Sequence, residues 1–225
     1  MDAAVVKVGG SLALQPEKLR GLCAKLSELS HWHTLIVVPG GGEFADTVRN
    51  LDKRFNLSTV TGHRMAILGM DQYGLLLSDL LPNSRIVTDF GGLQSALGFG
   101  SLPVFLPSTF LLSDKTLENS WDVTSDSIAV YIAEQLHLAR SLLVTDVDGV
   151  YTCDPKKFRE AKLIRKLSAS DLLKMSERTS VDRFLSKLLL KTHIECFVVN
   201  GLYPQRIEDI FTGKDTICTQ ITSNC

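Results

Sequence analysis

The stretch that decides the fold runs Leu142-Leu-Val-Thr-Asp-Val-Asp-Gly-Val-Tyr-Thr-Cys-Asp-Pro-Lys156. Its first three residues are apolar and predict a buried strand, and the residues that follow are small or acidic. A buried strand with such an end commonly borders a ligand crevice in an open α/β sheet. The pattern also fits an ordinary strand followed by a solvated turn, since Asp-Gly and Asp-Pro are common in turns. The other strand ends of the chain bear on this choice.

Strand and helix patterns alternate along almost the whole chain. Short apolar runs predict strands at residues 3–8, 35–38, 85–88, 103–106, 142–144, 196–199 and 216–221. Apolar residues at helical spacing predict helices at 16–29, 43–55, 62–81, 124–138, 182–191 and 204–211, and a shorter one from Ser168 or Ser170 to Met175. The alternation predicts an α/β fold with a mainly parallel sheet covered on both faces. Right-handed crossovers would place the carboxyl ends of the strands along one edge.

Composition and charge narrow the class of protein. The 225 residues are 44% hydrophobic and 22% charged, which is ordinary for a globular domain. A net charge of -1 gives no basic face for nucleic acid, and no apolar run is long enough for a membrane span. The N-terminus lacks the pattern of a signal peptide, and the cysteines lack the spacing of a zinc or redox motif. We expect one cytoplasmic domain without nucleic-acid or membrane partners, with a soft internal boundary near residues 119–123.

Two glycine-rich strand ends predict anion binding. Gly9-Gly10-Ser11 follows the first strand, and Gly40-Gly41-Gly42 follows the second and precedes a helix. Glycines let backbone amides approach an anion closely, and a helix N-terminus favours negative charge. Lys7 would add a mobile positive charge for a phosphoryl group. Each stretch also fits a plain turn, and neither is a Walker loop or a dinucleotide fingerprint.

Two further polar clusters precede predicted helices. The segment Trp121-Asp-Val-Thr-Ser-Asp-Ser127 holds more polar residues than a helix cap needs, and its Asp126 is placed to orient a lysine. His63 and Arg64 stand where the 62–81 helix is expected to begin, and basic groups there oppose the helix dipole unless they hold an anion. Simple capping and a surface His-Arg pair are the alternatives. Together with the glycine stretches, these groups suit phosphoryl transfer, in which positioning and charge neutralisation do most of the catalysis.

Four motifs, taken in order, resemble the amino acid kinase superfamily, which includes acetylglutamate, uridylate and isopentenyl phosphate kinases. They are Lys7-x-Gly9-Gly10-Ser11, Gly40-Gly41-Gly42, Thr124-Ser125-Asp126 and Thr145-Asp146-Val-Asp148-Gly149-Val150-Tyr151-Thr152-x-Asp154-Pro155-Lys156. The resemblance spans nearly the whole chain and implies a three-layer αβα sandwich. It also implies that the acceptor binds an N-terminal lobe (about residues 1–120) and that ATP with Mg²⁺ binds a C-terminal lobe (about 121–225).

The resemblance implies roles for individual residues. Lys7 would stabilise the transferred phosphoryl group, and Asp126 would orient Lys7. ATP would be held by Gly9, Gly10, Ser11, Thr145, Asp146, Gly149, Tyr151, Asp154 and Lys156. The acceptor would be held by Gly40, Gly41, Gly42, His63 and Arg64, with Arg49 as a further basic group. Magnesium would arrive with ATP and keep several waters, so no metal site made by the protein is expected.

A narrower resemblance concerns the acceptor. Pro39-Gly-Gly-Gly-Glu-Phe-Ala-Asp46, His63-x-Met65-Ala66 and Met70-Asp-Gln-Tyr-Gly74 resemble the small kinases of methanofuran biosynthesis. The implied acceptor is an aminomethylfuran-methyl phosphate, which is converted to its diphosphate. Uridylate and isopentenyl phosphate are alternative acceptors. A non-catalytic nucleotide-binding storage or regulatory protein of the same fold is the alternative from another class, although the presence of both Lys7 and Asp126 favours catalysis. Relatives form dimers, trimers or hexamers, so a homo-oligomer is expected.

One departure from the superfamily pattern concerns a second catalytic cation. Several relatives carry a Gly-Gly-Met-x-x-Lys-like stretch before a late helix, and its lysine assists catalysis. The corresponding region here reads Thr179-Ser-Val-Asp-Arg-Phe184, without that lysine. Arg183 and Lys156 are the two candidates for its role.

Overall fold

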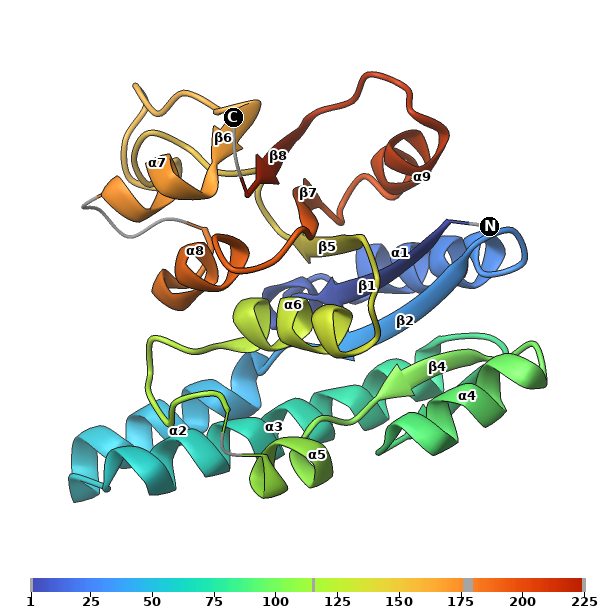
Figure 1. Cartoon of the computed structure of the whole chain (residues 1–225). Helices are drawn as coiled ribbons and strands as arrows, with labels where there is room; N and C mark the ends of the chain where they lie inside the picture. Colours follow the sequence, from blue (N-terminus) through green and yellow to red (C-terminus); the bar gives the residue numbers. More distant parts are fainter. Residues whose placement is uncertain (1, 115, 176–179, 224–225) are drawn as a thin grey trace.

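A single eight-stranded sheet runs through the molecule in the order β3-β4-β2-β1-β5-β7-β8-β6 (Figure 1). The computed structural model describes residues 2–114, 116–175 and 180–223, so Thr179 lies outside the described residues. The strands are β1 (Ala3–Val8), β2 (Thr34–Pro39), β3 (Ser84–Val87), β4 (Leu102–Phe105), β5 (Arg140–Thr145), β6 (Lys166–Ser168), β7 (Glu195–Asn200) and β8 (Cys218–Thr222). Every neighbouring pair is parallel except β7 with β8, which confirms the mainly parallel sheet.

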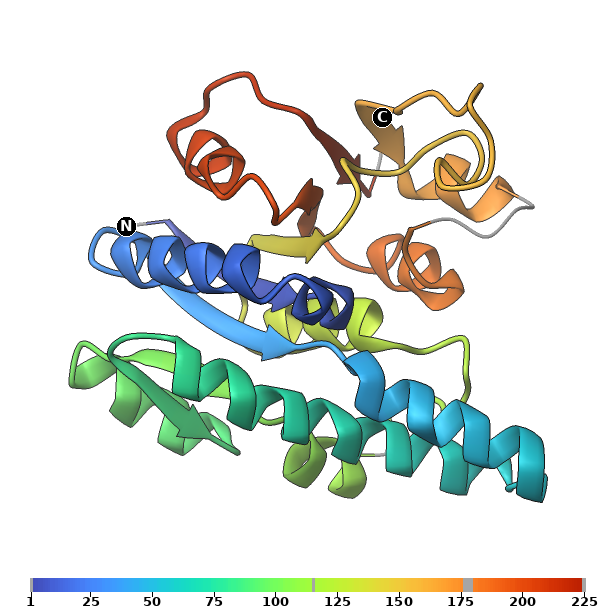
Figure 2. The same cartoon turned by 180° about the vertical axis from the view of Figure 1, so that it is seen from behind.

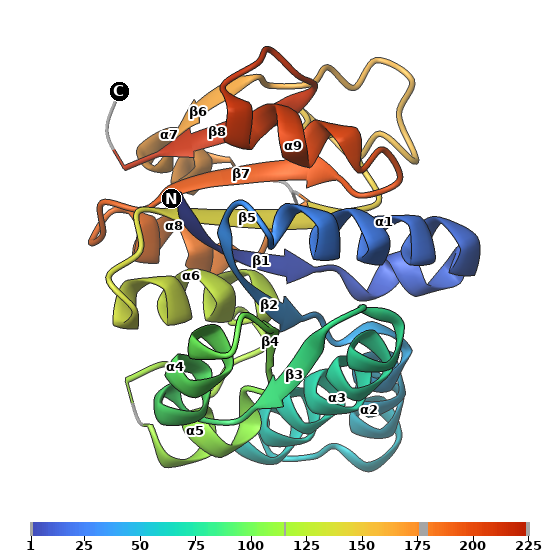
Figure 3. The same ribbon diagram turned by 90° about the vertical axis from the view of Figure 1, so that its right-hand side faces the viewer.

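Helices cover both faces of the sheet. One face carries η1 (Gly10–Leu14), α1 (Pro16–Leu29), α9 (Gln205–Thr212) and the C-terminal half of α3 (Thr59–Leu80) (Figure 2). The other carries α4 (Phe90–Gly98), α5 (Ser108–Ser113), α6 (Ser125–Gln135), α7 (Ala169–Lys174) and α8 (Arg183–Leu189), and Figure 3 shows the strands between the two layers. Helix α2 (Gly42–Phe55) packs on α3. The three-layer αβα sandwich is therefore confirmed.

The period of the strands decides which side chain reaches which layer. Successive residues of a strand point to opposite faces of the sheet. In β1, Val6 and Val8 join the core cluster beneath α1, whereas Val5 joins the cluster beneath α6. Lys7 follows the alternation of Val5, so its side chain emerges on the α6 side. Lys7 thus reaches the α6 side because it is an even number of residues from Val5, and alternate residues of a strand point to the same face.

The carboxyl ends of the central strands lie along one edge, as predicted. Gly9 donates its backbone N–H to the carbonyl of Val144, and Gly40 donates to that of Val8, each at 2.8 Å. The two glycine turns are in contact, because a Cβ added to Gly10 would lie 2.1 Å from Gly42. Only glycine fits at that position. Two neighbouring strands therefore deliver their glycine-rich ends to the same place.

Several element boundaries differ from the sequence prediction. Helix α3 begins at Thr59 rather than Gly62, because the side chain of Ser58 caps it by accepting from the backbone N–H of Thr61 at 3.2 Å. Helices α4 and α5 and strand β6 were not predicted. The early glycines of α4 weaken its helical pattern, but Asp89 caps it by accepting from Gly92 at 2.7 Å. Among the described residues, no helix is long and apolar enough to cross a membrane.

Candidate active site

An open cleft of about 1070 Å³ lies at the carboxyl edge of the sheet. Helices α2 and α3 form one wall, α7 and α8 form the other, and the end of β1 and the first turn of α6 lie between them. Figure 1 shows these walls on the left, with α2 below and α7 and α8 above. Of the residues predicted for the site, those that line the cleft are Lys7, Gly10, Ser11, Gly41, Gly42, His63 and Asp126.

Lys7 and Asp126 form a buried ion pair in this cleft. Lys7 Nζ lies 2.7 Å from Asp126 Oδ1, and the two residues are 8% and 7% exposed. Asp126 stands in the first turn of α6, where Thr124 is the N-cap. Removing two charges from water is expensive, so a buried pair is weak evidence for stability. The arrangement instead fixes a poorly solvated cation beside the glycine turns, which is where an anion would gain most from it.

Ser11 connects the first glycine turn to the loop after β5. Its hydroxyl group forms a hydrogen bond with Asp146, whose Oδ2 also lies 2.5 Å from Lys156 Nζ. Burial works to raise the pKa of Asp146, but the bonds from Lys156 and Ser11 outweigh it, and the pKa lies below its usual value. Asp146 is therefore an ionised anchor that ties the β5 loop to the Gly9-Gly10-Ser11 turn.

The remaining predicted nucleotide residues lie outside the cleft lining. They are Gly9, Thr145, Asp146, Gly149, Tyr151, Asp154 and Lys156. Gly9 and Gly149 are buried, so they shape the turns rather than face the cleft. The side chain of Asp154 accepts from the backbone N–H of Lys156 at 2.9 Å, and this bond closes the turn between the two residues. The structure thus divides the predicted ATP residues between the cleft and a loop beside it at the ends of β5 and β7.

That loop contains a polar cluster which the sequence reasoning missed. Asp148 Oδ1 accepts from Arg206 Nη1 at 2.5 Å and from Asn200 Nδ2 at 2.9 Å. Arg206 in turn lies over the ring of Tyr203, 4.3 Å from its centroid, and Tyr203 is 54% exposed. The signal available in the sequence was the Asn200-Gly201 strand end. An exposed aromatic ring backed by an arginine is a surface on which a nucleobase could stack.

His63 is placed in the wall formed by α3. It is 5% exposed and lines the cleft. Burial lowers the pKa of His63, although a hydrogen bond with the Ser120 backbone opposes this. The imidazole is therefore biased towards its neutral form in the free protein.

The position of Arg64 corrects an expectation. Because α3 begins at Thr59, His63 and Arg64 stand in its second turn, so the helix-dipole argument for an anion there is wrong. Adjacent helical residues differ by about 100° in direction, so the buried side of His63 leaves Arg64 exposed and off the cleft. The cation that does line this wall is Arg49 on α2.

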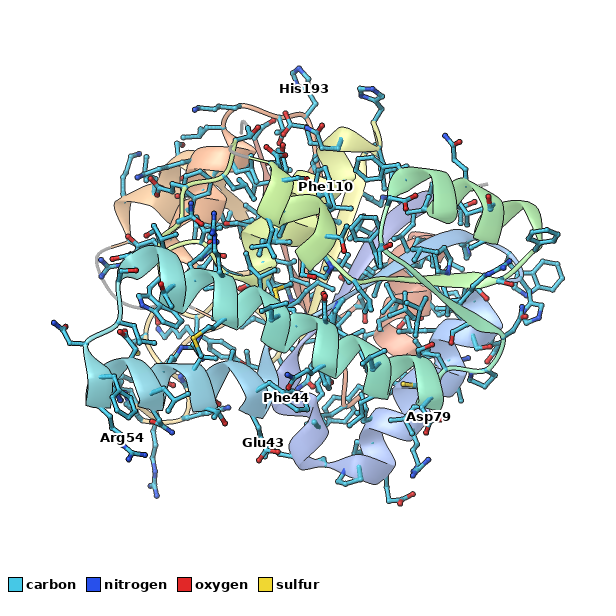
Figure 4. All side chains as sticks on the ribbon, turned by 90° about the horizontal axis from the view of Figure 1, so that it is seen from below. Glu43, Phe44, Arg54, Asp79, Phe110 and His193 are labelled. Carbon is cyan, nitrogen blue, oxygen red and sulfur yellow. The ribbon has the colours of Figure 1, made fainter. Side chains whose placement is uncertain are left out.

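Arg49 is held by two neighbours. Its Nη1 lies 2.6 Å from Asp46 Oδ1, and its Cζ lies 5.6 Å from the centre of the Trp121 ring. Glu43, at the start of α2, also lines the cleft. Figure 4 shows Arg54 directed away from the body at the other end of α2, and His193 on the opposite side of the molecule from Glu43. This wall therefore combines an arginine, a histidine, an indole ring and two carboxylates.

The opposite wall supplies residues that the sequence reasoning passed over or left open. Asp182 is the N-cap of α8, and Arg183 and Lys187 line the cleft on the same helix. Of the two candidates for a second cation, Arg183 faces the cleft, whereas Lys156 is paired with Asp146 outside its lining. Within the ranges that the structure covers, no group of three or more His, Cys, Asp or Glu side chains is placed to hold a metal ion.

Comparison with known proteins shows which family the chain belongs to. The model of the "Amino acid kinase family" matches residues 2–200, and the chain belongs to that family. Its members are kinases, and the chain is accordingly an ATP-dependent phosphotransferase. Among curated proteins, [5-(aminomethyl)furan-3-yl]methyl phosphate kinase of Methanocaldococcus jannaschii is 35% identical over 217 residues, which is 96% of each chain. The uridylate kinase of Pyrococcus abyssi is 26% identical over 93% of this chain and 95% of its own.

Solved structures agree on the fold. Uridylate kinase from Archaeoglobus fulgidus superposes with a TM-score of 0.77 at 21% identity, covering 99% of this chain and 100% of that one. A substrate complex of isopentenyl phosphate kinase gives a TM-score of 0.68 at 22% identity, covering 98% and 100%. At such identities the likeness concerns the fold alone.

Proposed function

We propose that this kinase transfers the γ-phosphoryl group of ATP to the phosphate of an aminomethylfuran-methyl phosphate and forms the diphosphate. The observation that carries the proposal is the buried Lys7–Asp126 pair beside two touching glycine turns in the cleft. The choice of acceptor is supported by the 35% identity, along 96% of both chains, to a kinase named for that substrate.

The chemistry needs little more than positioning. The second pKa of a phosphomonoester is about 6, so near neutral pH its oxygen is already deprotonated and attacks without a general base. The bond from that oxygen to the γ-phosphorus forms while the bond to the β–γ bridging oxygen breaks, and ADP leaves. Two anions must approach each other, and Lys7 reduces their repulsion where the phosphoryl group passes. Asp126 acts by holding Lys7 in place.

The nucleotide fits the glycine turns. Gly10 and Gly42 are in backbone contact, so the two glycine turns lie side by side in the cleft, and backbone N–H groups of such turns suit phosphate oxygens. Mg²⁺ prefers to keep waters and to bind phosphates with few protein ligands, so we expect it to arrive with ATP. When bound, the ion would neutralise charge on the ATP phosphates. Arg183, at the start of α8, is the proposed second cation.

The acceptor fits the α2–α3 wall. Arg49 presents a planar fork suited to a phosphate, and His63 is a second polar contact nearby. Trp121 gives an apolar surface for a furan ring, and Glu43 and Asp46 offer negative charge to the aminomethyl group. The wholly apolar tail of isopentenyl phosphate would offer no positive charge to these carboxylates. The wall therefore favours an acceptor with a phosphate at one end and an ammonium group at the other.

Two further expectations belong to the proposal. We place the reaction in the cytoplasm, where ATP is available. We also propose a homo-oligomer, because helix α3 presents Leu68, Leu75 and Leu76 at 46%, 52% and 40% exposure. Apolar residues close together on a helix surface commonly mark an interaction site.

The test is a direct comparison of acceptors. Purified protein is incubated with Mg-ATP and either aminomethylfuran-methyl phosphate, UMP or isopentenyl phosphate, and the products are followed by ³¹P NMR. We expect a diphosphate of the furan compound, with a kcat/KM at least about 100-fold above the other two, as a polar-group mismatch produces. A higher kcat/KM for UMP would overturn the acceptor assignment. ATP binding without turnover of any acceptor would support the storage or regulatory alternative.

A further inference from the structure

Asp182 connects the first turns of two helices that are far apart in the sequence. Its Oδ2 accepts from the backbone N–H of Thr124 at 2.9 Å, from the hydroxyl of Thr124 at 2.9 Å and from the backbone N–H of Ser127 at 3.0 Å. Its Oδ1 accepts from the backbone N–H of Leu185 at 2.8 Å and from the Ser127 hydroxyl. Asp182 thus caps its own helix α8 and also the start of α6.

This is more than a helix cap requires. An N-cap satisfies one or two backbone N–H groups of its own helix. Asp182 does so for α8 and also binds donors 55 and 58 residues away on α6. An ionised carboxylate offers about four lone-pair sites, and here Oδ2 is engaged by donors at the start of α6, while Oδ1 is engaged by donors from both helices. Ser127 is fully buried, so its hydroxyl has a fixed partner. The start of α6 is therefore fastened to the start of α8.

The first turn of α6, which Asp182 holds, contains Asp126 of the buried ion pair. Asp126 lies between Thr124 and Ser127, the two residues that Asp182 binds. Its Oδ1 is 2.7 Å from Lys7 Nζ. A rotation of the first turn of α6 would move this carboxylate and release the lysine. The geometry of the phosphoryl site thus depends on a side chain in the opposite wall of the cleft.

We propose that Asp182 is a positioning residue for phosphoryl transfer, which holds the first turn of α6 so that Asp126 keeps Lys7 directed into the cleft. This inference rests on the proposed function, because it concerns the same reaction. It explains why an acidic residue stands in this segment at the entrance to α8. The environment is costly for an anion, since burial and the nearby Asp126 raise the pKa of Asp182 to about 6. The hydrogen bonds from Ser127 and Thr124 oppose this rise in the pKa without cancelling it.

A double-mutant cycle tests this role. Wild-type turnover with the furan phosphate is measured first, and then that of Asp182→Asn, Lys7→Ala and the double variant. Asn keeps one acceptor oxygen but cannot accept from all the α6 donors. We expect Asp182→Asn to lower kcat about 10- to 100-fold while both KM values stay within about twofold. In the Lys7→Ala background the same change should alter kcat by less than about twofold, because the lysine that it positions is absent.

Two further variants serve as control and safeguard. Asp89 caps α4 outside the cleft lining, and Asp89→Asn should leave kcat unchanged, which separates positioning from loss of a cap. Ser127→Ala removes one α6 contact and leaves the α8 cap intact, so it decides the question if Asp182→Asn does not fold. It should lower kcat in the wild-type but not in the Lys7→Ala background.

The outcomes separate the two proposals. Folded Asp182→Asn with wild-type kcat, or an equal loss of kcat in both backgrounds, overturns the positioning role while the kinase assignment stands. If Asp182→Asn does not fold, a wild-type kcat in Ser127→Ala overturns the positioning role instead, and the kinase assignment still stands. Absence of wild-type turnover with every phosphomonoester overturns the proposed function itself.

Discussion

Lys7 Nζ and Asp126 Oδ1 lie 2.7 Å apart although strand β1 and helix α6 are separated by more than half the chain. The lysine reaches this partner because its parity in β1 directs it to the α6 layer, as that of Val5 does. The aspartate meets it because Thr124 and Asp182 fix the first turn of α6. The pair is the feature on which the catalytic predictions depend.

Replacing Lys7 should remove transition-state stabilisation with little effect on ATP binding. We expect Lys7→Ala to lower kcat by about 10²- to 10³-fold, the usual effect of losing one charge-stabilising group, with the ATP dissociation constant changed less than about fivefold. Steady-state kinetics and calorimetric ATP titration measure the two quantities. Lys53→Ala, on the exposed part of α2, is the matched control and should behave as wild type. Wild-type kcat in Lys7→Ala would remove this residue from the mechanism.

His63 lines the cleft, whereas its neighbour Arg64 is exposed and lies outside the lining. Substitution of Arg64 is therefore the control for substitution of His63. His63→Ala should raise the acceptor KM by about 10-fold or more with little change in kcat, because it removes a contact in the wall that we propose binds the acceptor. Arg64→Ala should leave both constants unchanged, since its side chain is off the cleft. An effect confined to the ATP KM would show that His63 belongs to the nucleotide side instead.

Acceptor binding should also take up protons at His63. Burial lowers the pKa of His63 in the free protein, and a phosphate dianion placed beside it would raise that pKa again. Titration calorimetry at pH 7 in two buffers with different ionisation enthalpies measures the protons taken up. We expect uptake in the wild type and a clearly smaller uptake in His63→Gln. Equal values in the two proteins would exclude this histidine as the group that titrates.

The free energy of unfolding should depend on pH because Asp182 titrates at a different pH in the folded and unfolded states. Its pKa is raised from 3.8 to about 6, so between these values the native state holds a proton that the unfolded chain has released. The contribution of Asp182 to the free energy of unfolding is therefore fully present below about pH 4 and is lost as the pH rises through about 6. Urea unfolding of the wild type and Asp182→Asn across this window should show a stability difference that shifts against the wild type as the pH rises.

Asp171 supplies the opposite case as a control. Hydrogen bonds from Ser168 and Lys174 lower the pKa of Asp171, so its contribution is present above the ordinary carboxyl pKa and is lost as the pH falls. The corresponding difference for Asp171→Asn should therefore shift in favour of the wild type with rising pH. A difference with the same sign for both variants would contradict the assignment of these shifts.

The contact between the two glycine turns gives a prediction about binding. Gly10→Ala would place its Cβ 2.1 Å from Gly42, so the turns must separate. We expect lower stability and ATP affinity reduced by about 10-fold or more, measured by thermal melting and titration. Gly21, in α1, has no atom within 4 Å of an added Cβ, and Gly21→Ala should instead stabilise the helix by about 1 kcal/mol. Unchanged ATP affinity in Gly10→Ala would remove this turn from the nucleotide site.

Local patterns in the sequence predicted the sheet and some of the residues that line the cleft, among them Lys7, His63 and Asp126. Alternation of strands and helices indicated the parallel sheet, and glycines at strand ends indicated the edge that borders the cleft. The role of Asp182 escaped prediction because its partners Thr124 and Ser127 are 55 or more residues away. Arg64 was favoured over Arg49 for a related reason: a shift of one turn in the start of α3 changes which residues open the helix. Burial and long-range capping decide such details, and neither leaves a local pattern.

The continuity of the sheet restricts how the enzyme can open and close. Strand β1 is bonded along its length to β2 on one side and to β5 on the other, so the N-terminal and C-terminal halves of the chain share one hydrogen-bonded base. A motion that separated β1 from β2 or from β5 would have to break these backbone hydrogen bonds. We therefore expect substrate entry and product release to involve the walls, α2 with α3 and α7 with α8, more than a separation of the central strands.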